Sequence, residues 1–239
     1  MTRTSELVAV EPFTAAPAQE AAQERTLVER YRQMAHEFQP GPVDRALRAL
    51  DVLVGGALLA VAAPLLLACA LAVLVTSGRP VLYRGSRVGR NGHLFVMYKL
   101  RTLRVDAETR LEPFLGPELT RLTSSELTRV GRLLRAGKLD ELPQLWNVVR
   151  GEMSLVGPRP IRPAFFEELC VTIPAYWQRL VVRPGLTGLA QLRLSREMTW
   201  EEKLAHDFEY IADRSPSLYA AVLVQTGAML VASLRGRES

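Results

Sequence analysis

The feature that most constrains this chain is a run of 24 uncharged residues at positions 52–75. A helix of about 20 apolar residues is long enough to cross the hydrocarbon core of a bilayer, so the run predicts a membrane helix. Pro64 lies in its middle. Proline removes one backbone donor and displaces the carbonyl of the preceding turn, so a bend is expected there. Each half would be about 18 Å long, which is too short to cross a bilayer alone.

Both flanks of this run are basic, and basic residues mark the cytoplasmic side of a membrane helix. A helix that enters the bilayer, bends at Pro64 and returns leaves both flanks on that side. We therefore favour a re-entrant helix-break-helix over residues 43–78, with an ordinary spanning helix as the alternative. The flanking arginines are Arg45 and Arg48 before the run, and Arg79, Arg84, Arg87 and Arg90 after it.

The remainder of the chain predicts an α+β fold that is mainly helical. Residues 1–42 lack apolar periodicity and end in Pro40-Gly41-Pro42, so we expect a flexible N-terminal extension. Residues 79–239 are expected to form a small cytoplasmic catalytic domain with interfacial helices. It would include a short β-hairpin, with strands at 81–88 and 93–103 around an Asn-Gly turn. The apolar run at 218–234 is marginal for spanning and predicts a packed or interfacial helix.

The composition favours phosphate ligands or an anionic lipid surface. The chain carries 27 arginines and 3 lysines, with a formal net charge of +5. Arginine is weakly hydrated and binds phosphate in a bidentate manner. The arginines are dispersed and lack interleaved aromatic residues, which argues against nucleic acid as a partner. The two cysteines, Cys69 and Cys170, show neither a disulfide framework nor metal-ligand spacing, so a reducing compartment is expected.

Asp140 and Glu141 form the sharpest candidate for chemistry. A carboxylate can attack phosphorus to form an acyl phosphate, and a second carboxylate can hold a divalent ion. The simpler interpretation is a helix cap, because Asp140 begins an expected helix at 140–149 and Pro143 suits its first turn. At such a helix start, the dipole would hold the carboxylate ionised. These residues alone favour the cap.

Five further residues are candidates for substrate binding. Lys99 and Arg101 are two apart on an expected strand, so they would share one face and suit a diphosphate; a solvated edge strand is the alternative. Arg159 lies between two prolines, which favours a phosphate or uracil contact or a structural salt bridge. Arg183 precedes a Pro-Gly turn, and Gln191 offers an amide for base or sugar recognition; either could equally be structural.

Residues 131–160, with Lys138-Leu-Asp-Glu-Leu-Pro-Gln-Leu-Trp146 at their centre, closely resemble the signature of bacterial sugar transferases. These are the monotopic phosphoglycosyl transferases, which start the synthesis of lipid-linked glycans. The resemblance runs from about residue 43 to the C-terminus and leaves residues 1–42 outside it. Four more segments resemble family motifs in family order: Arg87-Val-Gly-Arg-Asn-Gly92, Tyr98-Lys-Leu-Arg-Thr102, Arg183-Pro-Gly-Leu-Thr-Gly-Leu-Ala-Gln191 and Asp207-Phe-Glu-Tyr-Ile211.

The resemblance implies a complete reaction. Asp140 would attack the β-phosphate of a UDP-sugar and release UMP, and a polyprenyl phosphate would then take the phosphosugar from the covalent intermediate. Asp140 and Glu141 would be the catalytic dyad and would hold Mg²⁺. This is the first membrane step of exopolysaccharide or glycoconjugate synthesis.

The resemblance also implies a location. The enzyme would lie in the bacterial inner membrane, with its catalytic domain on the cytoplasmic face and its membrane helix broken at Pro64. Many members of the family have serine before this proline, where this chain has Ala63. The hydroxyl that could satisfy a freed carbonyl at the bend is therefore missing here.

Two other functions compete with the transferase. A membrane lipid phosphatase or pyrophosphatase could use the same carboxylates and metal, but it would release phosphate without a nucleotide. A non-catalytic adaptor of a glycan assembly complex predicts an altered dyad, whereas Asp140 and Glu141 are both present. The sequence leaves open the identity of the sugar and whether the chain forms a homo-oligomer.

Overall fold

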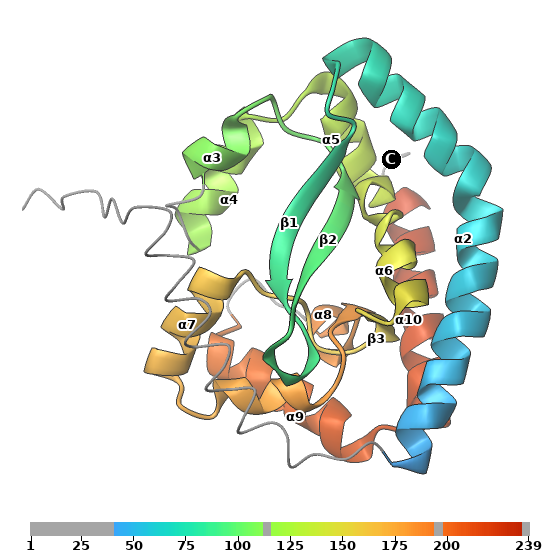
Figure 1. Cartoon of the computed structure of the whole chain (residues 1–239), viewed down its shortest axis with the longest axis vertical. Helices are drawn as coiled ribbons and strands as arrows, with labels where there is room; N and C mark the ends of the chain where they lie inside the picture. Colours follow the sequence, from blue (N-terminus) through green and yellow to red (C-terminus); the bar gives the residue numbers. More distant parts are fainter. Residues whose placement is uncertain (1–40, 112–115, 194–197, 236–239) are drawn as a thin grey trace, which may run out of the picture.

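One long helix arcs along the side of the remaining elements in the computed structural model, which describes residues 41–111, 116–193 and 198–235 (Figure 1). This helix is α2 (Pro42–Ser77), and the expected N-terminal extension lies outside the described residues except for 41 and 42. The other elements are β1 (Leu82–Val88), η1 (Arg90–Gly92), β2 (Leu94–Leu100), α3 (Ala107–Leu111), α4 (Gly116–Ser125), α5 (Arg129–Ala136), η2 (Leu139–Glu141), α6 (Gln144–Arg150), β3 (Ser154–Val156), α7 (Pro163–Thr172), η3 (Tyr176–Val181), β4 (Gly185–Thr187), α8 (Leu189–Leu192), α9 (Trp200–Asp213) and α10 (Pro216–Arg235).

Local sequence accounts for the ends of α2. Pro42 occupies the first turn, where its missing N–H costs nothing, and the carboxylate of Asp44 accepts a hydrogen bond from the backbone N–H of Gly41 at 2.8 Å. Gly78 ends the helix with a φ of 72°. Between these ends the helix continues through Pro64, so the expected separation into two helices is not found. Proline removes only one backbone hydrogen bond, and α2 accommodates that loss within a gradual curve (Figure 1).

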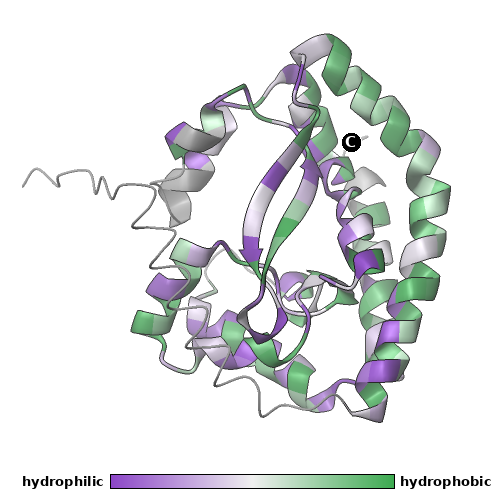
Figure 2. Ribbon diagram, viewed as in Figure 1, coloured by the Kyte–Doolittle hydropathy of each residue, from purple (hydrophilic) through white to green (hydrophobic). Residues whose placement is uncertain are grey.

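Most of the apolar surface of α2 faces away from the protein. At about 1.5 Å per residue, its 36 residues span about 54 Å. It is the one helix among the described residues that is long and apolar enough to cross a membrane, and only 11% of its most apolar window is buried. Figure 2 shows this hydrophobic face along the outside of the molecule. Its exposed large side chains include Leu53, Val61, Leu67, Leu71 and Val75.

Polar contacts attach both ends of α2 to the same folded unit. Near the N-terminal end, the Arg48 guanidinium donates to the carbonyls of Val148 and Val149 at 2.6 and 2.7 Å. One turn later, the buried carboxylate of Asp51 accepts three hydrogen bonds, from Ser154 Oγ, Leu155 N and Tyr219 Oη. At the other end, the Arg101 guanidinium donates to the last carbonyls of the helix.

The predicted hairpin is confirmed. Strands β1 and β2 pair antiparallel, and Asn91 in the connecting turn adopts the left-handed conformation, with a φ of 54°. Strand β2 ends at Leu100 rather than at 103, so Arg101 lies just beyond it. A second small sheet pairs β3 with β4 in parallel. Together with the many helices, these pairs bear out an α+β fold that is mainly helical.

The C-terminal apolar helix is longer than expected. It is α10, and it packs Tyr219 and Val222 into the main core while leaving Val224 and Val231 exposed. It also contacts α2. This arrangement agrees with the prediction of a packed or interfacial helix.

Candidate active site

Asp140 and Glu141 lie in a short 3₁₀ turn, η2, and not at the start of a regular helix. Lys138 precedes the turn in the left-handed conformation, with φ 54° and ψ 20°. Helix α6 begins only at Gln144, and Pro143 occupies its N-cap position. No side-chain capping bond is present at either element, so the interpretation of Asp140 as a helix cap is wrong. The end of the expected helix is confirmed, because Gly151 terminates α6 with a φ of 84°.

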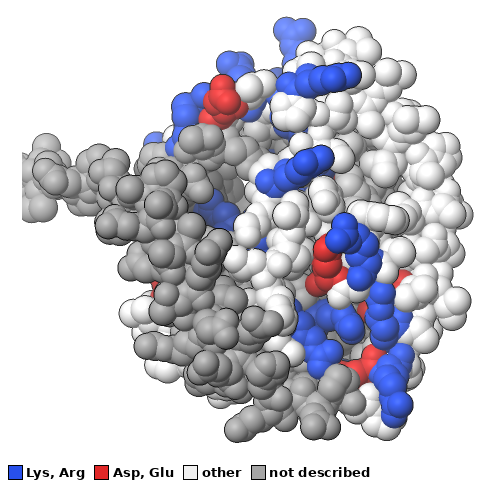
Figure 3. All heavy atoms as spheres, viewed as in Figure 1, with Lys and Arg blue, Asp and Glu red and all other residues white. Residues whose placement is uncertain are grey.

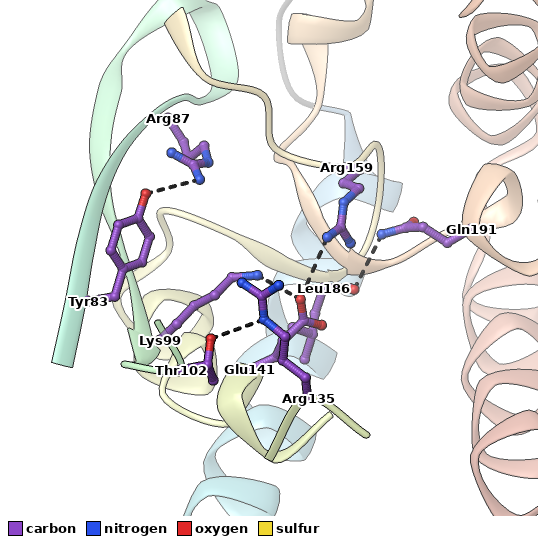
Figure 4. Close-up of polar contacts among 9 residues, drawn as sticks. All are labelled: Tyr83, Arg87, Lys99, Thr102, Arg135, Glu141, Arg159, Leu186 and Gln191. Atoms are coloured by element: carbon purple, nitrogen blue, oxygen red, sulfur yellow. Dashed lines mark hydrogen bonds and ion pairs between the residues drawn. The ribbon is translucent and has the colours of Figure 1, made fainter. Parts of the chain in front are cut away.

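Two cations hold the Glu141 carboxylate in place. Lys99 Nζ lies 2.7 Å from Glu141 Oε1, and Arg159 Nη2 lies 3.6 Å from the same oxygen (Figure 4). Burial by itself would raise the pKa of Glu141, but Lys99 and then Arg159 outweigh it and hold this pKa below its ordinary value. Glu141 is therefore a carboxylate anchored in its ionised form.

Asp140 has the opposite character. Its side chain is only 7% exposed, and burial raises its pKa despite the opposing charges of Lys99 and Arg135, while the charge of Glu141 raises it further. Arg135 is itself oriented by a hydrogen bond from its Nε to Thr102 Oγ1 at 3.0 Å. A helix dipole was expected to favour the ionised form of Asp140, but the net effect of its surroundings is to raise the pKa of this carboxyl, mainly through burial. The dyad combines one anchored carboxylate with one poorly solvated carboxylate that has no ion pair among the described residues.

A cavity of about 170 Å³ opens beside the dyad and contains four basic side chains. Its lining residues are Arg87, Met97, Lys99, Glu141, Gln144, Arg159, Pro160, Ile161, Arg162, Phe165, Gly185 and Leu186. Four cations against one lining carboxylate suit a ligand with several negative charges, such as a diphosphate. Figure 4 shows Lys99 and Arg159 converging on Glu141 from the hairpin and from the loop after β3.

Arg87 was missed as a site residue, although strand parity could have found it. In the hairpin register Lys99 pairs with Tyr83, and Arg87 lies on the same strand face as Tyr83 because residues four apart point the same way. Gly85 separates them, and a Cβ there would lie 2.0 Å from Tyr83 Oη. Its absence lets the Arg87 guanidinium reach the Tyr83 hydroxyl at 3.4 Å across the strand (Figure 4). Gln144 and Arg162 were also missed. Gln144 lies within the family signature but was not singled out there, and no pattern in the sequence pointed to Arg162.

The second sheet positions Arg159. The backbone N–H of Gly157 donates to Thr187 O, and that of Gly185 donates to Pro158 O, both at 2.8 Å. A Cβ on Gly185 would lie 2.1 Å from Gly157 N, so this close crossing requires glycine. The crossing holds Arg159 over the dyad, where it makes the salt bridge that was one of its two predicted roles.

The other three predicted substrate residues do not line this cavity. Arg101 donates to the Ser77 and Gly78 carbonyls and faces a different cavity, so it does not share a face with Lys99 beyond the end of β2. Arg183 donates through Nε to Gly151 O at 2.9 Å. Gln191 contacts the carbonyl of Leu186, a lining residue, at 3.4 Å (Figure 4). Substrate roles for these three residues remain predictions.

The chemistry of the dyad suits Mg²⁺. This ion usually takes one or two carboxylates and completes its shell with water and substrate phosphates. Among the described residues there is no group of three or more His, Cys, Asp or Glu side chains that could hold a metal. Asp140 and Glu141 could contribute two carboxylates to such a shell, which water and a substrate phosphate would complete.

Comparison with known proteins agrees with this geometry. A family profile described as bacterial sugar transferase matches residues 43–233. The chain is 44% identical over 71% of its length to a UDP-glucose:undecaprenyl-phosphate glucose-1-phosphate transferase of Caulobacter vibrioides, of which it covers 63%. It is 34% identical over 77% of its length to a UDP-N-acetylgalactosamine-undecaprenyl-phosphate N-acetylgalactosaminephosphotransferase of Aeromonas hydrophila, of which it covers 43%.

A third relative is similar in length. The exopolysaccharide production protein PSS of Rhizobium leguminosarum bv. phaseoli is 38% identical over 70% of this chain, which covers 86% of that protein. The chain spans less than two thirds of the Caulobacter and Aeromonas relatives. The match across residues 43–233 includes α2, the hairpin, the dyad and both small sheets. The chain therefore belongs to the bacterial sugar transferase family.

Proposed function

We propose that this protein transfers a sugar-1-phosphate from a UDP-sugar to a polyprenyl phosphate and releases UMP. The observation that carries the proposal is the dyad itself. Asp140 is a buried carboxylate that has no ion pair among the described residues, and the adjacent Glu141 lines a cavity with four cations. The names of the relatives support the same substrates, since they describe transfer from UDP-glucose or UDP-N-acetylgalactosamine to undecaprenyl phosphate.

In the first half-reaction, a carboxylate oxygen of Asp140 attacks the β-phosphorus of the UDP-sugar. The new bond joins this oxygen to phosphorus, and the bond between phosphorus and the bridging oxygen breaks, so UMP leaves with the electron pair. Lys99 and Arg159 lie beside the dyad, where they bind and orient the diphosphate. Poor solvation of Asp140 favours attack because the nucleophile has little water to shed.

In the second half-reaction, an oxygen of the polyprenyl phosphate attacks the same phosphorus. The bond to Asp140 breaks and the carboxylate is regenerated, so the product is a polyprenyl diphosphate sugar. Mg²⁺ held by Asp140 and Glu141 together with the diphosphate would neutralise part of the negative charge. Glu141 suits this role because Lys99 and Arg159 keep its pKa low, so it remains ionised at neutral pH.

We infer that α2 inserts into one leaflet and that both of its ends remain on the cytoplasmic face of the bacterial inner membrane. Support comes from the contacts at its ends: Arg48 and Asp51 bond to the folded unit at one end, and Arg101 bonds to Ser77 and Gly78 at the other. A spanning helix would carry one of these ends across the bilayer, and its polar contacts with the domain would be lost. The curve of α2 at constant helicity replaces the sharp break predicted at Pro64.

The reaction is tested by measuring UMP release from a panel of UDP-sugars. The full chain is held in nanodiscs with Mg²⁺, with and without polyprenyl phosphate. At least one sugar should give UMP, and Asp140→Asn should lower turnover by about 10³-fold or more, because an amide is a poor nucleophile. Asp213→Asn, on an exposed residue of α9, is the matched control and should retain activity. Failure of every sugar, or full activity of Asp140→Asn, would overturn the proposal.

Two readouts separate the alternatives. A lipid phosphatase would release inorganic phosphate from polyprenyl phosphate or diphosphate without any nucleotide. Topology is tested with Arg45→Cys and Arg79→Cys, two exposed positions, one in the first turn of α2 and one just after its end, after replacement of Cys69 and Cys170 by alanine. Both new thiols should react only with reagents added on the cytoplasmic side. Labelling of one of them from outside would restore the spanning helix.

A further inference from the structure

A second basic cavity lies where α2 ends, and it shares no lining residue with the cavity beside the dyad. Its volume is about 560 Å³. The end of α2, the segment after β2 and the start of α5 contribute its walls. The lining residues are Thr76, Ser77, Arg101, Arg104, Val105, Thr128, Arg129 and Val130. Three arginines and three hydroxyl side chains line it, and no carboxylate among the described residues does.

Arg101 is the buried cation of this cavity, and hydrogen bonds hold it in place. Its side chain is only 6% exposed, and its Nη2 donates to Ser77 O at 2.5 Å and to Gly78 O at 2.8 Å. Its Nε and Nη1 are buried and have no hydrogen-bond partner. A buried guanidinium with two unpartnered nitrogens is costly, since buried polar groups are nearly always hydrogen-bonded and buried charges are paired. An anion in the cavity would supply the missing partner.

The surroundings of Arg101 also favour the binding of an anion. Arg104 and Arg129 are exposed and form no ion pair among the described residues, so their charges are available. Thr128 caps α5, and the first turn of this helix lines the cavity with the positive end of its dipole. The end of α2 would oppose an anion through its carbonyls, but Arg101 already neutralises two of them. The net field in the cavity is therefore positive.

The position of the cavity indicates the source of the anion. Leu71, Leu74 and Val75 are the last exposed apolar side chains of α2, and the cavity begins at the next residue, Thr76. With α2 in the leaflet, this level corresponds to the phosphates of the lipid headgroups. Figure 3 shows Lys and Arg side chains gathered along this end of the molecule, next to the uncharged surface of α2.

We propose that the cavity formed by Arg101, Arg104 and Arg129 binds the phosphate of an anionic membrane phospholipid and anchors the end of α2 at the membrane surface. The proposal rests on the insertion of α2 given above. We assign the occupant as a structural lipid and not as the acceptor substrate, because Glu141 of the dyad lines the other cavity and the two cavities share no lining residue.

The test is lipid retention by the full chain in detergent, measured by native mass spectrometry without any UDP-sugar. Phosphatidylglycerol is titrated against phosphatidylcholine with the same acyl chains. The wild-type protein should retain phosphatidylglycerol preferentially. The double variant Arg104→Gln/Arg129→Gln should weaken that retention about 25-fold, at about fivefold per arginine. Arg101→Gln should also weaken it, and the double variant keeps the test decisive if Arg101→Gln does not fold.

Arg132→Gln is the matched control, because this exposed arginine lies on α5 outside the cavity. It should retain phosphatidylglycerol like the wild type. Equal loss in the control, or no loss in the double variant, would overturn the site. Inorganic phosphate that binds as tightly as the lipid, or retention of polyprenyl phosphate alone, would overturn its assignment to a phospholipid. Because UMP release is measured separately, failure here is distinguishable from failure of the transferase reaction.

Discussion

Two basic cavities lie close together in the sequence, because Lys99 lines one and Arg101, just beyond the end of β2, lines the other. They differ in the groups that their cations contact. Lys99 points into the cavity beside the dyad and pairs with Glu141 at 2.7 Å. Arg101, two residues later, points into the cavity at the end of α2 and bonds only to backbone carbonyls. The first cavity contains carboxylate, whereas none lines the second among the described residues.

The difference separates a site built for reaction from a site built for binding. Cations paired with acids are held in position, and their charges partly cancel until a phosphate enters. Cations without acids keep their full attraction for an anion but offer no nucleophile or metal ligand. Basic side chains therefore have different roles on the two sides of the end of β2.

The largest effect that separates the cavities is expected for Glu141→Gln. The amide cannot hold Mg²⁺ as a carboxylate does, and it leaves Lys99 without its counter-ion, so turnover should fall about 10²- to 10³-fold. Retention of phosphatidylglycerol should be unchanged, because Glu141 does not line the second cavity. UMP release and native mass spectrometry on the same preparation give both values. A parallel fall in lipid retention would show that the two cavities are not independent.

The next largest effect is expected in the pH dependence of kcat/KM for the variant Lys99→Met. Lys99 lowers the pKa of Asp140 and of Glu141, so its removal raises the pKa of both carboxylates. Both would then take up protons at higher pH, and the acidic limb of kcat/KM should move to higher pH. At pH 7 kcat/KM should fall about tenfold or more through the lost phosphate contact. Arg101→Met should leave the limb in place, since Arg101 is not among the principal charges acting on Asp140; a shift in that variant would contradict the separation.

The sequence predicted the helices and strands around the first cavity better than the local conformation of the residues that line it. Local patterns predicted the uncharged run, the Asn-Gly hairpin and the end of the helix at Gly151, whereas the catalytic dyad was implied only by the family resemblance. The 3₁₀ turn at Asp140 was not predicted, because the choice between a cap and a turn depends on Lys138 adopting the left-handed conformation. The rise in the pKa of Asp140 was not foreseen either, because it comes mainly from burial, which is a property of the packed chain.

The second cavity could not be predicted, because it depends on contacts between distant segments. Residues 76–77, 101–105 and 128–130 meet only after the hairpin returns to the end of α2. Arg101 was assigned to the wrong neighbours for a simple reason: strand parity puts it beside Lys99 only if β2 continues to 103, and β2 ends at Leu100. The course of α2 through Pro64 depends in the same way on packing at both of its ends.

A smaller effect is expected on stability, and it is specific to the second cavity. Anionic lipid that completes the contacts of Arg101 should raise the unfolding temperature of the wild-type protein by a few degrees, as binding to the folded state does. Thermal unfolding in nanodiscs of phosphatidylglycerol and of phosphatidylcholine measures this difference. Arg104→Gln/Arg129→Gln should lose most of it, while Arg132→Gln should keep it. An equal difference in all three proteins would reflect the bilayer in general and not the cavity.

The smallest effect should come from salt. Arg104 and Arg129 are exposed, so raising the ionic strength from about 0.05 to about 0.5 M should weaken phosphatidylglycerol retention several-fold. The ion pair between Lys99 and Glu141 is screened less, because its side chains are only 19% and 21% exposed, so the position of the acidic limb should move little over the same range. Titration of both properties against salt therefore compares an open cluster of like charges with a partly buried pair. A limb that moves with salt as strongly as lipid retention does would mean that water reaches the dyad as freely as it reaches the end of α2.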